Sequence, residues 1–127
     1  MAKQTGKYRS QFEAQMGEVL EPAGAEYEPF NIRYTQSYNY TPDFVFAVEP
    51  TLEVLVEAKG WFRPGDRAKY KAIRDALPSH QELVFLLMHP AKKVSKGATL
   101  TMSGWCTKEG IEWFMSAEGV IKYVNAL

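Results

Sequence analysis

The chain has 127 residues, with 15 basic and 15 acidic side chains and therefore a formal net charge of zero. A dedicated nucleic-acid binder is usually more basic, so any such surface must come from local clustering of charge. The single cysteine, Cys106, excludes an internal disulfide and indicates a reducing compartment, so we expect a cytoplasmic protein. No apolar run approaches the ~18 residues of a membrane span.

The N-terminal third of the sequence predicts one helix and two strands. Residues 1–8 are polar and we expect them to be disordered. Ser10 and Glu13 have the spacing of a capping box, which predicts a helix that Pro22 ends by about residue 21. Residues 26–40 are rich in aromatic and β-branched types without helical periodicity, which predicts a strand, an irregular turn and a second strand.

The rest of the chain alternates strand and helix signals. We expect strands at 44–48 and 53–58 around a turn at 49–51, followed by a helix at 66–77 capped by Asp66. A buried central strand at 82–88 and a basic loop at 89–98 come next. The remaining elements are a short helix from Thr101 or Ser103 to Gly110, a strand at 111–114 and a short helix within 116–127. This order predicts a small α/β domain in which helices pack on a mixed sheet.

A hairpin centred on Pro50 brings two acids together. It places Phe44 opposite Val56, makes one face of the strand pair wholly apolar, and sets Asp43 directly opposite Glu57. Like charges in this position destabilise a sheet unless a cation lies between them. Oxygen ligands suit Mg²⁺.

Lys59 lies on the same face of the strand as Glu57. It could orient or deprotonate a water, or stabilise negative charge, which would make the group a phosphodiesterase site. The alternative is a solvated strand end at which Lys59 neutralises the two acids.

Basic residues cluster in two stretches that could neutralise DNA phosphates. They are Lys92, Lys93 and Lys96 in the predicted loop, and Arg63, Arg67, Lys69 and Lys71 after the second hairpin strand. A solvated loop is the alternative for the first stretch. Tyr34, Tyr38 and Tyr40 could stack on bases or simply pack in a strand. His80 and His89 have no metal-ligand spacing, and Cys106 is expected to be a core residue.

Pro42-Asp43 followed by Glu57-Ala58-Lys59 resembles the PD-(D/E)xK signature of a nuclease superfamily. The likeness to one of its members extends over residues 8–114. Arg9-Ser10 with Glu13, Glu26-Tyr27-Glu28, Tyr40 to Phe44, Val56 to Gly60, Asp66-Arg67 and Lys96-Gly97 occur in the order seen in the bacteriophage endonuclease I family of Holliday-junction resolvases.

This resemblance implies a metal-dependent endonuclease with a restriction-endonuclease-like mixed sheet flanked by helices, in a single domain over residues 1–127. It implies that Asp43, Glu57 and Glu13 hold Mg²⁺, for which Mn²⁺ can substitute, and that Lys59 is catalytic. For Glu13 the capping box is the competing role. Glu26 looks like an additional acid, with Glu28 as its competitor.

The resemblance also implies partners and a biological setting. DNA, branched or duplex, would be bound by Arg9, Arg63, Arg67, Lys69, Lys92, Lys93 and Lys96. A homodimer with an exchanged first helix would act in recombination, in the host cytoplasm. The alternatives are a nicking or general DNA-degrading endonuclease without junction preference, and a non-catalytic DNA-binding module on the same fold.

Overall fold

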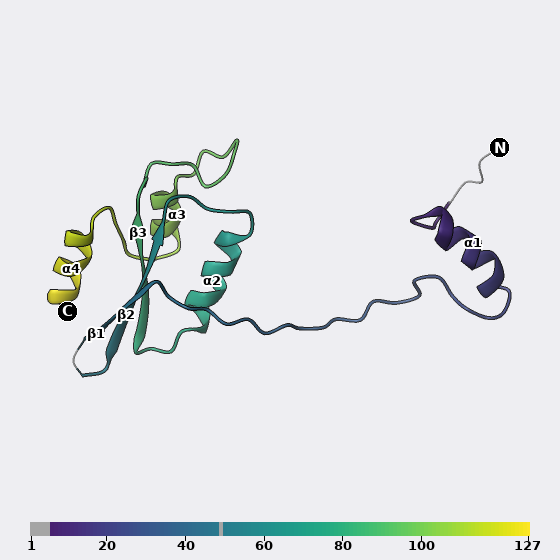
Figure 1. The fold of residues 1–127 in the computed structure, drawn as a ribbon, viewed down its shortest axis with the longest axis horizontal. Coiled ribbons are helices and arrows are strands. Elements are labelled where there is room, and N and C mark those ends of the chain that lie inside the picture. The colour runs from purple at the N-terminus through teal and green to yellow at the C-terminus, as the bar shows by residue number, and fades with distance from the viewer. Residues whose placement is uncertain (1–5, 49) are drawn as a thin grey trace. The chain divides into compact units, whose positions relative to one another are not determined.

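The computed structural model describes residues 6–48 and 50–127. The chain divides into two compact units, an N-terminal unit that ends at Tyr38 and a larger unit from Asn39 to Leu127. Figure 1 shows the elements in the order α1, β1, β2, α2, β3, α3, β4, α4. The single domain expected over residues 1–127 stays a prediction.

The N-terminal unit is built on helix α1, Gln11–Leu20, which begins and ends as predicted. Ser10 has an extended backbone, and its side chain accepts a hydrogen bond from the Glu13 backbone N–H at 3.1 Å. This bond satisfies one of the donors left free at a helix start. Glu21 is the C-cap of the helix, and Pro22 follows it directly.

Two residues before α1 make defined contacts. The Lys7 ammonium lies 2.6 Å from the Glu21 carboxylate, and the Tyr8 ring packs edge-on against Tyr27 at 4.6 Å between ring centres. Tyr8 also lies over Gly17, where an added Cβ would meet its hydroxyl at 2.5 Å. Disorder was expected for residues 1–8. Residues 1–5 lie outside the described residues, and the expectation is wrong for Lys7 and Tyr8, whose side chains make these contacts.

The two strands predicted within residues 26–40 are wrong, because the structure has no strand between α1 and Phe44. Four large apolar side chains of this segment are exposed, namely Phe30, Ile32, Tyr34 and Tyr38. β-Propensity reflects packing on a half-buried sheet surface with neighbouring strands. In the described chain this segment pairs with no strand, so its composition alone does not make a sheet.

The larger unit contains a four-stranded mixed sheet, as predicted. Its strands are β1 (Phe44–Val48), β2 (Leu52–Lys59), β3 (Gln81–Leu87) and β4 (Trp113–Phe114), in spatial order β1-β2-β3-β4. β1 and β2 are antiparallel, and the other two pairs are parallel. The hairpin register is confirmed, since Phe44 pairs with Val56 and Phe46 with Val54. Glu49 in the predicted turn lies outside the described residues.

Three helices pack on this sheet. They are α2 (Asp66–Ala76), α3 (Met102–Lys108) and α4 (Ala117–Asn125). Thr101 caps α3 as expected. The cap predicted for α2 is wrong, because Gly65 with φ of 89° occupies that position while Asp66 is already helical. The Asp66 carboxylate instead accepts hydrogen bonds from Lys59 Nζ and the Arg63 backbone N–H. None of the helices in the described residues is long and apolar enough to cross a membrane.

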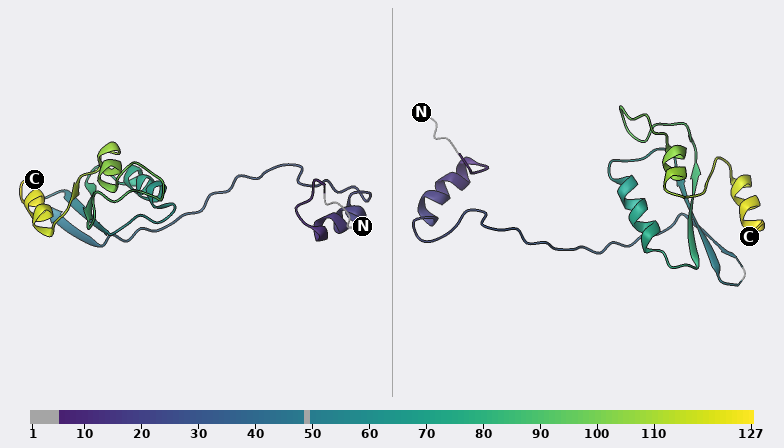
Figure 2. Two further views of the ribbon diagram at one scale, coloured as in Figure 1. Left: turned by 90° about the horizontal axis from the view of Figure 1, so that it is seen from above. Right: turned by 180° about the vertical axis from the view of Figure 1, so that it is seen from behind.

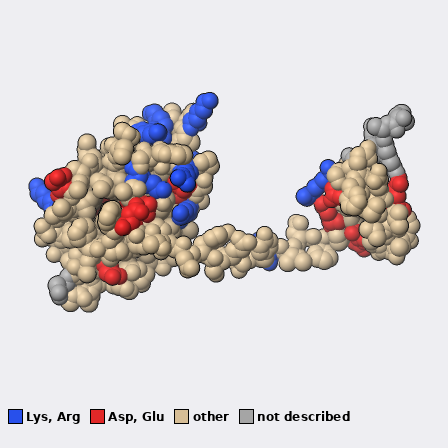
Figure 3. All heavy atoms as spheres, in the orientation of Figure 1, with Lys and Arg blue, Asp and Glu red and all other residues tan. Residues whose placement is uncertain are grey.

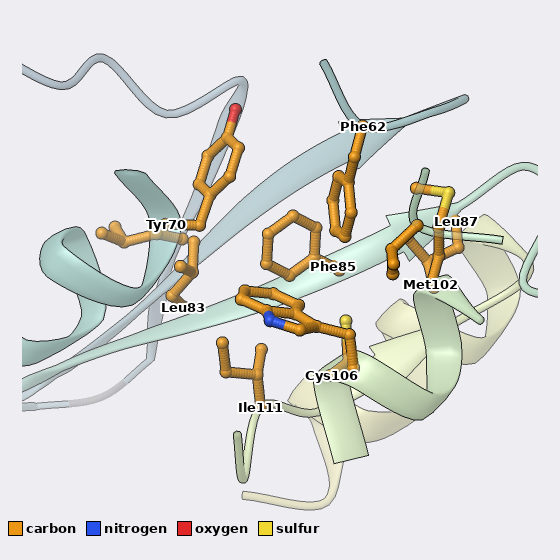
Figure 4. Packing of buried hydrophobic residues seen from close by; sticks show 11 residues of the cluster. Phe62, Tyr70, Leu83, Phe85, Leu87, Met102, Cys106 and Ile111 are labelled. Atoms are coloured by element: carbon orange, nitrogen blue, oxygen red, sulfur yellow. The ribbon is translucent and has the colours of Figure 1, made fainter. Parts of the chain in front are cut away.

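Both faces of the central strands β2 and β3 are buried, whereas the hairpin pattern predicted only one apolar face. α4 covers one face, where Val120 packs on Val54, Val56 and Val84. α2 and α3 cover the other, and Figures 1 and 2 show them across the sheet from α4. Figure 4 shows Phe85 at the centre of this second cluster, between Phe62 and Tyr70 and above the residues of α3. Cys106 is buried there, and burial raises the pKa of its thiol to about 12, as expected of a core residue rather than a nucleophile.

Candidate active site at the end of strand β2

Asp43 is held against the end of β2 just before its own strand begins. Its Oδ2 accepts a hydrogen bond from the Ala58 backbone N–H at 2.9 Å. The neighbouring pair Phe44 and Val56 continues in the register that sets Asp43 beside Glu57. The predicted meeting of the two carboxylates agrees with this register, and the charge of Asp43 raises the pKa of Glu57.

Glu57 is a buried carboxylate, with 7% of its surface exposed. Tyr40 donates a hydrogen bond from its hydroxyl to Glu57 Oε1 at 2.6 Å. Burial raises the pKa of Glu57, the bond from Tyr40 lowers it, and the charge of Asp43 raises it again, with a net upward shift. The pair thus concentrates negative charge where water cannot fully solvate it, which is a condition that a bound cation relieves.

Lys59 faces the same side as Glu57 and is tied to α2. Its Nζ lies 3.4 Å from Asp66 Oδ2 and 5.0 Å from the centre of the Tyr70 ring. Burial lowers the pKa of Lys59, but the hydrogen bond with Tyr70 and the charge of Asp66 outweigh it, so that the pKa is raised. The ammonium form therefore persists at neutral pH. Among the roles left open for Lys59, orienting water or stabilising negative charge agrees with this state better than accepting a proton.

Asp66 is a buried acid whose role the sequence pattern did not reveal. It is 8% exposed, and Oδ2 accepts from both Lys59 Nζ and the Arg63 backbone N–H, the latter at 2.9 Å. The same atom thus joins the lysine to the loop between β2 and α2. Its position at a helix start suggested capping instead. Tyr40 was missed in the same way, since neither base stacking nor strand packing predicted that its hydroxyl donates a hydrogen bond to Glu57.

The donor set of the larger unit suits a hard divalent cation. Asp43 and Glu57 supply carboxylate oxygens, and Mg²⁺ binds proteins through one or two carboxylates while it keeps several waters. In the described part of the chain, no group of three or more His, Cys, Asp or Glu side chains is placed to hold a metal ion. Two carboxylates are within the number that Mg²⁺ takes from a protein, so this pair is sufficient as a protein donor set.

Glu13 and Glu26 belong to the N-terminal unit. Glu13 accepts hydrogen bonds from the Ser10 hydroxyl at 3.3 Å and the Tyr27 hydroxyl at 3.4 Å. Both acids line a hollow of about 220 Å³, whereas Glu28 forms an ion pair with Arg9 at 3.0 Å. That Glu13 and Glu26 act with Asp43 and Glu57 stays a prediction.

The two basic stretches meet in the larger unit. Arg63, Arg67, Lys92, Lys93 and Lys96 line one hollow of about 760 Å³, whose wall begins at Trp61, two residues after Lys59. Figure 3 shows Lys and Arg side chains gathered over this end of the unit. Lys69 does not line the hollow, and its ammonium lies 5.3 Å from the Tyr70 ring centre. Arg9 is part of the N-terminal unit.

Two acids and a protonated lysine at a strand end, beside a hollow rimmed by five cations, are the features of a nucleic-acid hydrolase on an α/β fold. The chain belongs to the phage endonuclease I family, since the model of that family matches residues 1–122. This membership identifies it as a phage-type endonuclease. No individual curated protein matches the chain.

Proposed function

We propose that this endonuclease hydrolyses DNA phosphodiester bonds in a metal-dependent reaction and acts on branched DNA. The observation that carries the proposal is the buried Glu57 beside Asp43, a charge pair that is unfavourable until a cation joins it. Mg²⁺, or Mn²⁺ in its place, would be held by Asp43 and Glu57 and would supply water activation and neutralisation of phosphate charge.

The protein's own residues orient the reacting groups. Tyr40 fixes Glu57, and the Ala58 N–H fixes Asp43. Lys59, kept protonated and directed by Asp66 and Tyr70, donates a hydrogen bond to the attacking water or to a non-bridging phosphate oxygen. The cations of the hollow hold neighbouring phosphates without reading sequence.

We further propose a homodimer that exchanges its first helix, so that Glu13 completes the site of the partner. Phe12, Met16, Val19 and Leu20 expose apolar surface on α1, which a second copy would cover. Glu26 would enter the site with Glu13, because both line the same hollow. Two sites held at a fixed separation give a physical basis for cutting both strands at a junction.

Cleavage of a labelled synthetic four-way junction, compared with a linear duplex of the same sequence, tests the proposal. We expect Mg²⁺-dependent cuts in two strands at the junction and much slower cutting of the duplex. Lys59→Ala should slow junction cleavage by about 10²- to 10³-fold. Lys108→Ala, an exposed lysine of α3 outside the hollow, is the control and should be unaffected.

The other outcomes identify the alternatives. Equal rates on junction and duplex would replace junction resolution with general nicking or degradation of DNA. Binding to both substrates without any cleavage, with Mg²⁺ or Mn²⁺ present, would make the protein a non-catalytic DNA-binding module and contradict the proposal.

A further inference from the structure

Trp61 is an exposed indole beside the catalytic lysine. It follows Lys59 by two residues, is 51% exposed and lines the basic hollow. We infer that Trp61 stacks on an unpaired nucleobase, which makes the hollow a subsite for a single-stranded nucleotide next to the scissile bond. This inference rests on the proposed function and extends it to the form of the DNA.

The lining of the hollow combines apolar and cationic groups. Trp61 and Pro64 contribute apolar surface, and five Lys and Arg side chains line the hollow with them. Among residues 6–48 and 50–127, no acidic residue lines it. A phosphate needs only the cations. An unpaired nucleotide uses both parts, because its base has an apolar π-face and its phosphate is anionic.

Arg63 supports the same interpretation. Its guanidinium lies 5.8 Å from the centre of the Trp61 ring, a distance at which a cation and an aromatic ring attract each other. The Arg63 backbone N–H is in turn held by Asp66, the residue that also binds Lys59. The stacking surface is therefore fixed to the same loop and the same carboxylate as the catalytic lysine.

A paired base in an intact duplex is already stacked and cannot offer its face to Trp61. A flap, a gap or an opened branch point can. The subsite would therefore favour substrates with unpaired nucleotides beside the cut over continuous duplex. An acidic peptide would match the cations but would leave the indole unused.

Equilibrium binding of the full chain to two fluorescein-labelled DNAs tests the inference, with EDTA present to prevent cleavage. One DNA is a continuous duplex, and the other is the same duplex with a single-stranded thymidine flap. Trp61→Ala should weaken flap binding about ten-fold and change duplex binding less than about two-fold. Trp61→Phe should keep most of the affinity for the flap. Met115→Ala, which removes an exposed apolar side chain outside the hollow, should change neither.

An equal loss on both DNAs, or no loss on either, would overturn the inference. The inference would also be overturned if a poly-glutamate peptide displaced the flap DNA and if Trp61→Ala weakened the binding of that peptide. Mg²⁺-dependent nicking of plasmid by the unmodified protein is measured in parallel. Nicking without any effect of Trp61 on flap binding rejects the stacking subsite alone, while selective flap binding without nicking rejects the proposed catalytic function alone.

Discussion

Glu57 is a buried acid for which we propose a role in chemistry at a cost in stability. It is almost fully removed from water, and the charge of the neighbouring Asp43 raises its pKa more than the charge of Lys59 lowers it. Its bond from Tyr40 offsets part of that cost and fixes its direction. A residue chosen for stability alone at this position would be apolar, as Leu55 is two residues earlier on the same face.

Glu57→Gln should therefore raise stability in the absence of metal. The pKa of Glu57 is raised in the folded protein, so folding is favoured by its protonation and is opposed as pH rises through the shifted range. Glutamine keeps an acceptor for Tyr40 without the charge. In EDTA at pH 7 we expect the variant to have the higher Tm, with the difference shrinking as pH falls toward the ordinary carboxylate range.

The same melting measurement is repeated with Mg²⁺ in place of EDTA. Mg²⁺ should raise the Tm of the unmodified protein, because a ligand that binds only the folded state stabilises it, and should have little effect on Glu57→Gln. A variant that melts below the unmodified protein at pH 7 in EDTA would contradict the account of an uncompensated charge.

Asp66 is predicted to act on catalysis through Lys59. Asp66→Asn retains an oxygen for the Arg63 N–H but loses the charge that holds the lysine. By analogy with residues that orient catalytic ligands, we expect kcat to fall about 10- to 100-fold with a smaller change in KM. Asp75→Asn, on the exposed side of the same helix, is the control. An unchanged kcat, or a loss confined to KM, would show that Asp66 only maintains the loop.

At the scale of elements, strand β3 carries the core on which the site rests. Phe85 is fully buried, and its ring meets those of Phe62, Tyr70 and Trp105 at 5.2 to 6.2 Å between centres. Phe85→Ala should cost about 3–5 kcal/mol of unfolding free energy, measured by urea denaturation. Met115→Ala removes exposed apolar surface and should cost under about 0.5 kcal/mol. Similar costs for the two variants would contradict the assignment of Phe85 to the centre of the core.

The elements that the sequence predicted well have local causes. Ser10 and Thr101 cap helices through their own side chains, and the alternation around Pro50 fixes the hairpin register. The strands predicted within residues 26–40 were wrong because strand formation needs a neighbouring strand. The roles of Asp66 and Tyr40 were not predicted for a related reason. Their partners Lys59 and Glu57 are brought to them only by the packing of α2 and of the residues before β1.

At the scale of the whole molecule, α1 is expected to mediate assembly. Val19 lies on the apolar side of α1 and is 67% exposed, so Val19→Lys would place a charge in the proposed dimer contact. Sedimentation equilibrium should show a dimer for the unmodified protein and a shift toward monomer for the variant, with junction cleavage reduced more than about ten-fold. Gln15→Lys, an exposed position of the same helix, should remain dimeric. A monomeric unmodified protein that cleaves junctions at full rate would reject the exchanged dimer.

Nicking of supercoiled plasmid tests most directly whether Asp43, Glu57 and Lys59 form a metal-dependent nuclease site. We predict conversion to the nicked form in Mg²⁺, none in EDTA, and a loss of at least about 100-fold in each of Asp43→Asn, Glu57→Gln and Lys59→Ala. Nicking that persists in EDTA, or that survives these substitutions, would contradict it.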